Sequence, residues 1–382
     1  MSRKQTRSQP KSTHWTELSG NVVSRYYIAS TEIYYFRCLL GKNMLLSVDG
    51  GATKTLAAIY DGTSNNIVGS GVSGSSNYAE VGAENAGGSL RAAINGALDM
   101  ALVDEKQIDH AIFSIASVGD SIEYTEIGKK IVSEAYGGRN YTLINDGMAA
   151  YRMANLDFDG VIFAPGTGSV GFMKKGNEFK RIGGWGPLFG DEASAYWIGR
   201  KFLTYATRAQ DGLDGYDKSL PLSIEEIFNT DFREAVTKLT RERKKREIAS
   251  LAVHVTRLAK EGSETCNRIL NEAAGYISEF ITSTYNIFGD RIKYSLVGGT
   301  MLSGKFYVDR IVKQTKPKVR VYYGYQVAIG GIIELLERKG IKTTEEDRDV
   351  LLNGLNRAVS QIDSNTLLSN LLFEKPVEPL SV

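Results

Sequence analysis

Two short turns rich in glycine and threonine are the part of this chain best suited to bind an anion. The first lies in SVDGGATKTLAAIYDG (47–62) and the second in APGTGSVGFMKKG (164–176), and each joins two strand-like runs. Glycine leaves backbone N–H groups unobstructed by a Cβ atom, and threonine or serine adds a hydroxyl donor. A single turn of this kind also occurs in ordinary β-hairpins. The pair, one in each half, predicts two related domains that face one cleft and hold one polyphosphate.

The first turn is preceded by an acidic residue, which suggests a metal. Asp49 ends its strand at the turn, where its carboxylate is placed to hold a Mg²⁺-bound water rather than to pack in a core. Glycines permit each turn, while hydroxyl and ammonium groups would donate to phosphate. The candidate phosphate-binding residues are Gly50, Gly51, Thr53, Lys54 and Thr55 in the first turn and Gly166, Thr167, Gly168 and Ser169 in the second.

A second carboxylate lies in NDGMAA (145–150), where a strand ending at Ile144 gives way to a helix. Asp146 therefore lies at a helix N-terminus, and its position taken alone favours a role as the N-cap. A hydroxyl that attacks a γ-phosphoryl group also needs a nearby carboxylate to accept or orient its proton. The residues by themselves leave both roles open.

Three more side chains are candidates for holding a substrate. Asp191 precedes a helix beginning near Ala195, which it could cap. Trp185 lies between glycines and is placed to offer an apolar face to a sugar or a nucleotide. Asp120 closes SVGD at a strand end, which suits a metal-bound water, a substrate or an ordinary loop.

These residues lie between strands and helices that alternate. The expected strands are 44–48, 56–61, 110–116, 141–146, 160–165, 170–175, 294–299 and 319–323, and the expected helices are 83–103, 121–136, 147–155, 191–207, 224–260, 264–288 and 327–339. Strands separated by helices of this length predict an α/β protein with mostly parallel central sheets. The basic run RERKKRE (241–247) is interpreted as the solvated face of a long helix.

Composition narrows the class of protein. With 382 residues, the chain is longer than one compact domain usually is. The net charge of +2 is too close to zero to indicate a surface that binds nucleic acid, and the apolar runs are too short to cross a bilayer. The two cysteines, Cys38 and Cys266, cannot frame a disulfide scaffold or a zinc site within one chain. We therefore expect a cytoplasmic protein that binds neither nucleic acid nor membrane.

Five motifs taken together resemble one known family. They are DGGATKT (49–55), NDGMAA (145–150), APGTGS (164–169), GGWGPLFGDEASAYWIG (183–199) and LVGGTMLSG (296–304). Their order and spacing resemble those of the N-acetylglucosamine kinase-like and BadF/BadG/BcrA/BcrD-type ATPases, part of the superfamily of sugar kinases, heat-shock chaperones and actin. The resemblance covers about residues 44 to 339. It implies two actin-like (ribonuclease H-like) domains around a nucleotide-binding cleft.

The resemblance also implies roles for residues. Asp146 matches the family's general base, and Asp191 matches a residue that binds a sugar hydroxyl. SSNYAEVG (75–82) is similar to a sugar-binding stretch of the family, which makes Asn77 a candidate for hydroxyl binding. Gly298 and Gly299 match the adenosine motif, where backbone lies against the nucleotide. The implied cofactors are ATP and Mg²⁺, the implied substrate is a small sugar or sugar acid, and a homodimer is possible in this family.

The resemblance and the patterning together divide the chain. We expect actin-like domains at residues 44–156 and 157–340, followed by a helical C-terminal tail at 341–382. Residues 1–43 carry a net charge of +5, which leaves −3 for residues 44–382, and their apolar stretch is interrupted by charges. We interpret residues 1–43 as a disordered extension or the product of an upstream start, and a tether or targeting arm as the alternative.

One position departs from the family and bears on the substrate. Animal N-acetylglucosamine kinases follow GTGS with a sugar-binding asparagine, whereas this chain has Val170. The leading expectation is an ATP-dependent kinase acting on a sugar, an amino sugar resembling N-acetylglucosamine or a sugar acid resembling 2-keto-3-deoxygluconate. The alternatives are an ATPase that activates a partner enzyme, which needs cluster-binding cysteines, and a non-catalytic sugar sensor.

Overall fold

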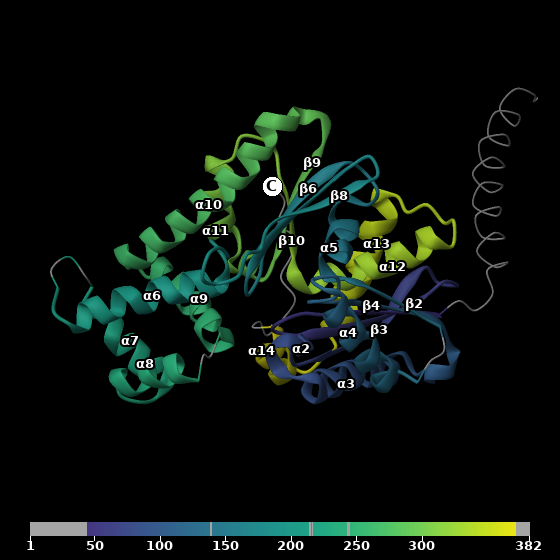
Figure 1. Ribbon diagram of the computed structural model, residues 1–382, viewed down its shortest axis with the longest axis horizontal. Coiled ribbons are helices and arrows are strands. Elements are labelled where there is room, and N and C mark those ends of the chain that lie inside the picture. Colours follow the sequence, from purple (N-terminus) through teal and green to yellow (C-terminus); the bar gives the residue numbers. More distant parts are fainter. Residues whose placement is uncertain (1–43, 138–139, 214, 216, 243–244, 372–382) are drawn as a thin grey trace, which may run out of the picture.

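The computed structural model describes residues 44–137, 140–213, 215, 217–242 and 245–371. They form two lobes, each built on a five-stranded sheet flanked by helices (Figure 1). The expectation for residues 1–43 lies outside these ranges and stays a prediction. None of the described helices combines the length and the apolar character needed to cross a membrane.

The first lobe holds a mixed sheet with strand order β3-β2-β1-β4-β5. Its strands are β1 (Met44–Gly50), β2 (Thr55–Asp61), β3 (Asn66–Ser73), β4 (Ile108–Ile115) and β5 (Tyr141–Asn145). β1, β2 and β3 form an antiparallel meander, whereas β4 and β5 extend the sheet in parallel from β1. The central strand β1 is buried from Leu45 onward, which explains its nearly continuous apolar run MLLSV.

The second lobe repeats this topology. Its strands are β6 (Gly160–Pro165), β7 (Ser169–Lys175), β8 (Glu178–Gly183), β9 (Lys293–Gly298) and β10 (Arg320–Tyr323), in the order β10-β9-β6-β7-β8. β6, β7 and β8 form an antiparallel meander, and β9 and β10 continue from β6 in parallel. The two glycine-rich turns therefore occupy equivalent places, β1–β2 and β6–β7. The predicted pair of related domains is confirmed, although each sheet is mixed rather than mostly parallel.

Two edge strands, β3 and β8, are not among the strands expected from the sequence. β3 has the sequence NIVGSGVS, whose glycines argue against a strand. They are required because helix α3 (Ala83–Ala101) lies directly on them: a Cβ atom at Gly71 would come within 2.1 Å of the Ala93 carbonyl oxygen. β8 has four exposed residues out of six, so it carries little apolar signal.

The expected helices at 83–103, 121–136, 147–155, 191–207, 264–288 and 327–339 are present with small shifts. They are α3, α4 (Ile122–Ala135), α5 (Asp146–Asn155), α6 (Ala195–Gln210), α10 (Glu264–Phe288) and α12 (Ala328–Arg338). The expected single helix at 224–260 is wrong, because α7 (Leu220–Phe228), α8 (Phe232–Arg241) and α9 (Lys245–Lys260) replace it. Asn229 ends α7 in the left-handed region at φ 49°, and Asp231 caps α8 by accepting from the Arg233 and Glu234 N–H groups.

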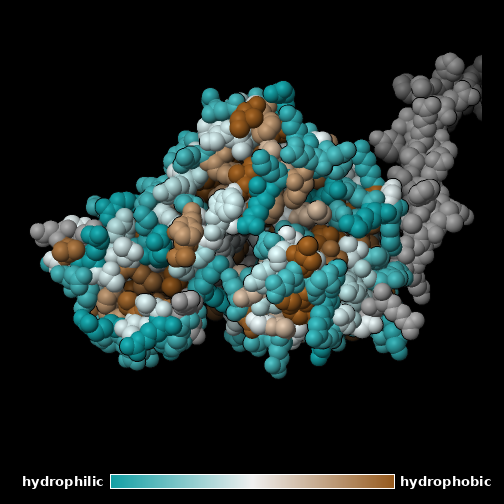
Figure 2. Space-filling view, in the orientation of Figure 1, coloured by the Kyte–Doolittle hydropathy of each residue, from teal (hydrophilic) through white to brown (hydrophobic). Residues whose placement is uncertain are grey.

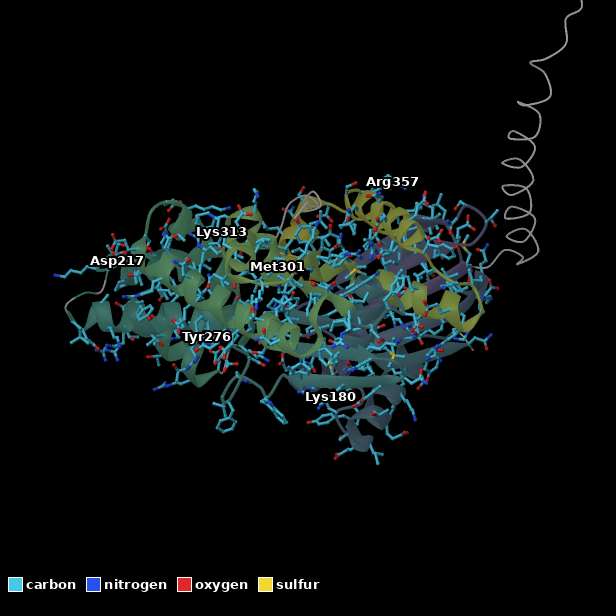
Figure 3. All side chains as sticks on the ribbon, turned by 90° about the horizontal axis from the view of Figure 1, so that it is seen from above. Lys180, Asp217, Tyr276, Met301, Lys313 and Arg357 are labelled. Atoms are coloured by element: carbon cyan, nitrogen blue, oxygen red, sulfur yellow. The ribbon has the colours of Figure 1, made fainter. Side chains whose placement is uncertain are left out.

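The chain returns to the first lobe before residue 340. α12 packs against β1, β4 and α5, and the following helices α13 (Glu345–Val359) and α14 (Ser364–Leu371) pack against β3. The packing thus groups α12 with the first lobe rather than with the expected unit 157–340, because its apolar face covers the first sheet. Seen from above, Arg357 of α13 lies near the upper edge of the molecule in the view, and the buried Met301 lies in its interior (Figure 3).

Candidate functional site

A cavity of about 1140 Å³ lies between the two lobes. The space-filling view shows the surface hollowed there (Figure 2). Both glycine-rich turns, the start of α5, the segment after β9 and one face of α9 contribute to its wall. Of the residues predicted for the site, those that line it are Asp49, Gly51, Thr53, Lys54, Asn77, Asp120, Asp146, Gly166, Thr167, Gly168, Ser169, Asp191, Gly298 and Gly299.

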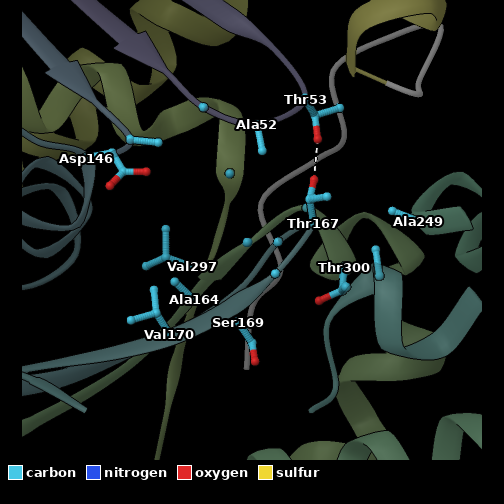
Figure 4. A pocket seen from close by; sticks show the side chains of 18 of the residues that line it. Ala52, Thr53, Asp146, Ala164, Thr167, Ser169, Val170, Ala249, Val297 and Thr300 are labelled. Carbon is cyan, nitrogen blue, oxygen red and sulfur yellow. Dashed lines mark hydrogen bonds between the residues drawn. The ribbon is translucent and has the colours of Figure 1, made fainter. Parts of the chain in front are cut away.

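The two turns meet across the cavity, as their pairing in the sequence predicts. The Thr53 and Thr167 hydroxyl groups form a hydrogen bond with each other (Figure 4). Because one of the two O–H groups donates in this bond, the other keeps its hydrogen for an anionic oxygen. The two turns therefore bring donors from both lobes to one place.

Two residues of the first turn lie behind the cavity wall instead. Gly50 packs against Ser76, whose Oγ atom would lie 2.2 Å from a Cβ atom at this position. The Thr55 side chain is fully buried, and its hydroxyl donates to the Gly74 carbonyl oxygen at 2.8 Å. Neither lines the cavity, so these two residues shape the turn, and a hydroxyl at position 55 has no access to phosphate.

Asp49 and Lys54 form a largely buried ion pair within the first turn. Lys54 Nζ lies 2.6 Å from Asp49 Oδ2, and the two side chains are 14% and 8% exposed. Both line the cavity. Within the described part of the chain, no cluster of three or more His, Cys, Asp or Glu side chains could hold a metal unaided.

Asp146 is the first residue of α5, and the cap of that helix is its neighbour Asn145. The Asp146 carboxylate is half-buried at the cavity wall and accepts from the Gly147 N–H at 2.9 Å. Burial, followed by repulsion from Asp49, raises the pKa of Asp146 to about 7. Because the helix already has a cap, the capping interpretation of Asp146 is wrong, and its carboxylate remains free to take up a proton near neutral pH.

Polar side chains from the first lobe extend the wall beside Asp146. Asn77 is buried and caps α2 (Tyr78–Val81), where its Oδ1 accepts from the Ala79 N–H at 3.3 Å and from the Ser117 hydroxyl at 3.0 Å. The Asn77 amide nitrogen is not used by these bonds and can donate to a ligand. Asp120 pairs across the cleft with Arg181 of β8 at 3.1 Å, and both side chains are nearly half exposed.

Asp191 reaches the cavity from the loop before α6. It is buried in the left-handed region at φ 59°, a conformation that few residues other than glycine adopt. A Cβ atom at Gly168 would approach Asp191 Oδ2 to 2.7 Å, so the second turn and Asp191 are in close contact. Burial raises the pKa of Asp191, while the Lys245 ammonium and hydrogen bonds from backbone N–H groups lower it.

The loop between β8 and α6 places its large apolar side chains outside the cavity. Trp185 is 77% exposed, and the nearby Leu188 and Phe189 are more exposed still. Trp185 is absent from the cavity wall, unlike its neighbours Gly184 and Gly186, so the expected apolar face is not offered in this arrangement. Val170 does line the cavity and is half-buried there (Figure 4).

The segment after β9 carries the predicted adenosine motif. Gly298 lies so close to the second turn that a Cβ atom there would meet the Pro165 carbonyl oxygen at 2.2 Å. Thr300 donates to the same carbonyl at 2.8 Å, which fixes this segment to the turn. Gly298 and Gly299 thus present backbone to the cavity, as expected for a surface that lies against a nucleotide.

One whole face of α9 lines the cavity, although none of its residues is among the site residues expected from the sequence. The lining residues include Lys245, Arg246, Ala249, Val253, Arg257 and Lys260. Their spacing follows one stripe of a helix, so periodicity held a signal for a shared face. The interpretation of the basic run 241–247 as a solvated face is wrong for Lys245 and Arg246, and only tertiary packing shows that they border the cleft.

The two lobes share one strand topology, and both glycine-threonine turns line the cavity between them. This arrangement is the one found in the class of actin-like ATPases. Residues 46–334 match the BadF/BadG/BcrA/BcrD ATPase family, to which this chain belongs. The fold agrees with a solved structure from Chromobacterium violaceum at a TM-score of 0.60 and 20% identity, covering 77% of this chain and 99% of the other.

Sugar kinases are among the similar proteins. The chain is 28% identical over 269 residues to the N-acetyl-D-glucosamine kinase of Dictyostelium discoideum, covering 65% of this chain and 82% of that kinase. It is 24% identical to a glucosamine kinase of Vibrio cholerae, covering 65% of this chain and 83% of the kinase. A Streptomyces griseus ROK family glucokinase in complex with glucose and AMPPNP has a TM-score of 0.51 at 15% identity, covering 78% of this chain and all of that one.

Proposed function

We propose that this protein is an ATP-dependent kinase that transfers the γ-phosphoryl group of ATP to a hydroxyl group of a sugar, an amino sugar or a sugar acid. The observation that carries the proposal is the place of Asp146. Its carboxylate lines the same cavity as the paired turns and has a pKa near 7. A general base works best when its pKa lies near the working pH. The sugar and amino-sugar kinases among the similar proteins support the same class of reaction.

The residues around the cavity divide the work of phosphoryl transfer. The hydroxyl hydrogen left free in the Thr53–Thr167 pair would donate to a phosphate oxygen, and backbone at Gly298 and Gly299 would lie against the nucleoside. The Ser169 hydroxyl is already used, because it donates to the Glu192 carbonyl oxygen at 2.8 Å. Lys54 would balance phosphate charge while it remains paired with Asp49.

Asp49, which lines the cavity at the first turn, would hold Mg²⁺ through water. When bound, this ion would neutralise charge on the phosphate oxygens.

The substrate hydroxyl would approach Asp146 from the part of the cavity bordered by Asn77, Asp191 and Val170. Asn77 can donate from its amide, and Asp191 can accept from sugar hydroxyl groups. Asp146 would then take the proton of the attacking hydroxyl as the new O–P bond forms.

An ATPase that activates a partner enzyme is the second candidate, and Cys266 argues against it. Such an activator needs accessible thiolates to hold an iron–sulfur cluster. Cys266 is fully buried inside α10, and burial raises the pKa of its thiol to about 11. Cys38 lies outside the described residues. A non-catalytic sugar sensor, the third candidate, would have no use for a carboxylate titrating near 7.

A screen of ADP release separates the three candidates. The purified protein would be incubated with Mg²⁺ATP and hexoses, amino sugars and sugar acids one at a time. A kinase releases ADP only with its sugar, an activating ATPase releases it without sugar, and a sensor releases none. ADP release that is independent of every sugar, or absent throughout, would overturn the kinase proposal.

A further inference from the structure

The first turn of α9 reaches from the second lobe to the first through two adjacent cations. α9 packs against α6 and α10 of the second lobe. Lys245 Nζ lies 2.9 Å from Glu80 Oε1 on α2 of the first lobe. Arg246 Nη2 donates to the Ser369 carbonyl oxygen on α14 at 3.0 Å. These contacts join residues far apart in sequence and span the cleft.

Both ends of this bridge adjoin the cavity. Glu80 follows Asn77 by three residues in the same short segment, so the pair with Lys245 lies beside the proposed sugar-binding amide. Ser369 precedes Asn370 and Leu371, which line the cavity themselves. α14 lies outside the family match at 46–334.

Lys245 also acts on the opposite side of the site. Its ammonium lowers the pKa of Asp191, against the effect of burial, so the two charged groups are close enough to interact. Lys245 therefore interacts with a carboxylate of each lobe, and it lines the same cavity as Asp191. Its pair with Glu80 is half-buried, with side-chain exposures of 27% and 34%, where screening by solvent is reduced.

We propose that Lys245 and Arg246 form an interlobe clasp, a pair of positioning residues that hold the sugar-binding wall of the first lobe against the phosphate-binding turn of the second. The inference rests on the proposed function. Phosphoryl transfer depends on holding the acceptor hydroxyl and the phosphate in line. A clasp that spans the cleft would fix that distance without touching either reacting group.

The kinetic test uses charge reversal across the cleft. Lys245→Met and Glu80→Lys should each raise the KM for the sugar by about fivefold or more and raise the ratio of ADP released to sugar phosphorylated. The double variant with Lys245→Glu and Glu80→Lys should recover most of both losses. Lys201→Met is the matched control, because Lys201 pairs with Glu272 within the second lobe at 2.7 Å with exposures of 28% and 33%. It should leave both quantities unchanged.

A distance measurement tests the clasp without relying on kinase activity. Spin labels at Asp99→Cys on α3 and Lys238→Cys on α8, in a Cys38→Ser background, would report the separation of the lobes. Lys245→Met and Arg246→Met should each broaden the distance distribution or shift it outward, and Lys201→Met should not. The clasp is overturned if the distance distribution is unchanged in both Lys245→Met and Arg246→Met. It is also overturned if the double variant with Lys245→Glu and Glu80→Lys recovers neither the KM for the sugar nor the ratio of ADP to phosphorylated sugar. A wild-type protein that phosphorylates no sugar refutes the proposed function alone.

Discussion

Asn145 caps helix α5, which leaves the carboxylate of its neighbour Asp146 facing the cavity. Asn145 Oδ1 accepts from the Gly147 N–H at 2.8 Å, and its Nδ2 donates to the Val118 carbonyl oxygen at 2.7 Å. These two bonds tie the end of β5 to the loop after β4. Asp146 is thereby held on a fixed backbone, and its carboxylate is available to a ligand. A reacting group gains precision from such support.

The first prediction concerns Asp146 as the general base. Asp146→Asn keeps the size of the side chain but removes the proton acceptor. We expect kcat to fall by at least about 100-fold while the affinity for ATP stays nearly unchanged. Steady-state kinetics and calorimetric titration with an ATP analogue would measure the two effects. Retention of more than about a tenth of the wild-type kcat would contradict the role of Asp146.

The second prediction follows from the direction of the pKa shift. Because the pKa of Asp146 is raised to about 7, the carboxylate is largely protonated below neutral pH and cannot accept the hydroxyl proton. We expect kcat/KM, which reports the free enzyme, to fall about tenfold for each pH unit below 7. A profile that stays flat down to about pH 5 would show that no group with this pKa is required.

The third prediction concerns stability. The folded-state pKa of about 7 lies above the ordinary aspartate pKa of 3.8, so the folded protein binds the proton more tightly than the unfolded chain. The ionised carboxylate therefore destabilises the fold, and this cost grows as pH rises from about 4 to 7. Asp146→Asn should raise the Tm at about pH 8.5 by at least ~2 °C, with a smaller rise at about pH 4.5. Scanning calorimetry at both pH values would measure it, and an equal or larger rise at the lower pH would contradict the raised pKa.

The fourth prediction separates two threonines of the first turn. Thr53 contacts Thr167 at the cavity, whereas the buried Thr55 hydroxyl donates to the Gly74 carbonyl oxygen. Thr53→Val should raise the KM for ATP by about threefold to tenfold, because one donor to phosphate is lost. Thr55→Val, the matched control, should lower the Tm and leave the KM for ATP unchanged. The reverse result would place the phosphate donors elsewhere.

Local sequence patterns were enough to predict the fold and the central residues of the candidate site. The two turns, the strand ends and the helix starts each have a signature within about ten residues, and the repeated topology confirmed that the turns face each other. The same patterns could not separate Thr53 from Thr55, because Thr53 lies in the turn whereas Thr55 begins β2 and donates to the Gly74 carbonyl oxygen, a contact with the segment that follows β3.

What the sequence could not show depends on distant contacts. Lys245 and Arg246 belong to a basic run that is expected on any solvated helix, and their partners Glu80 and Ser369 lie more than a hundred residues away. The choice of Asn145 over Asp146 as the cap is equally hidden, because both residues are good caps and the Val118 carbonyl decides between them.

The last prediction concerns Val170 and the choice of substrate. Val170 lines the cavity and offers no hydrogen bond, so an acetamido or hydroxyl group buried against it would lose about 1–3 kcal/mol, which is roughly fivefold to over a hundredfold in kcat/KM. We therefore expect N-acetylglucosamine to be a poorer substrate than some neutral hexose or sugar acid. Val170→Asn should narrow the gap by restoring a donor, and Val170→Leu, of similar shape without one, should not. If the wild type prefers N-acetylglucosamine, or both variants leave the ratio unmoved, another residue sets specificity.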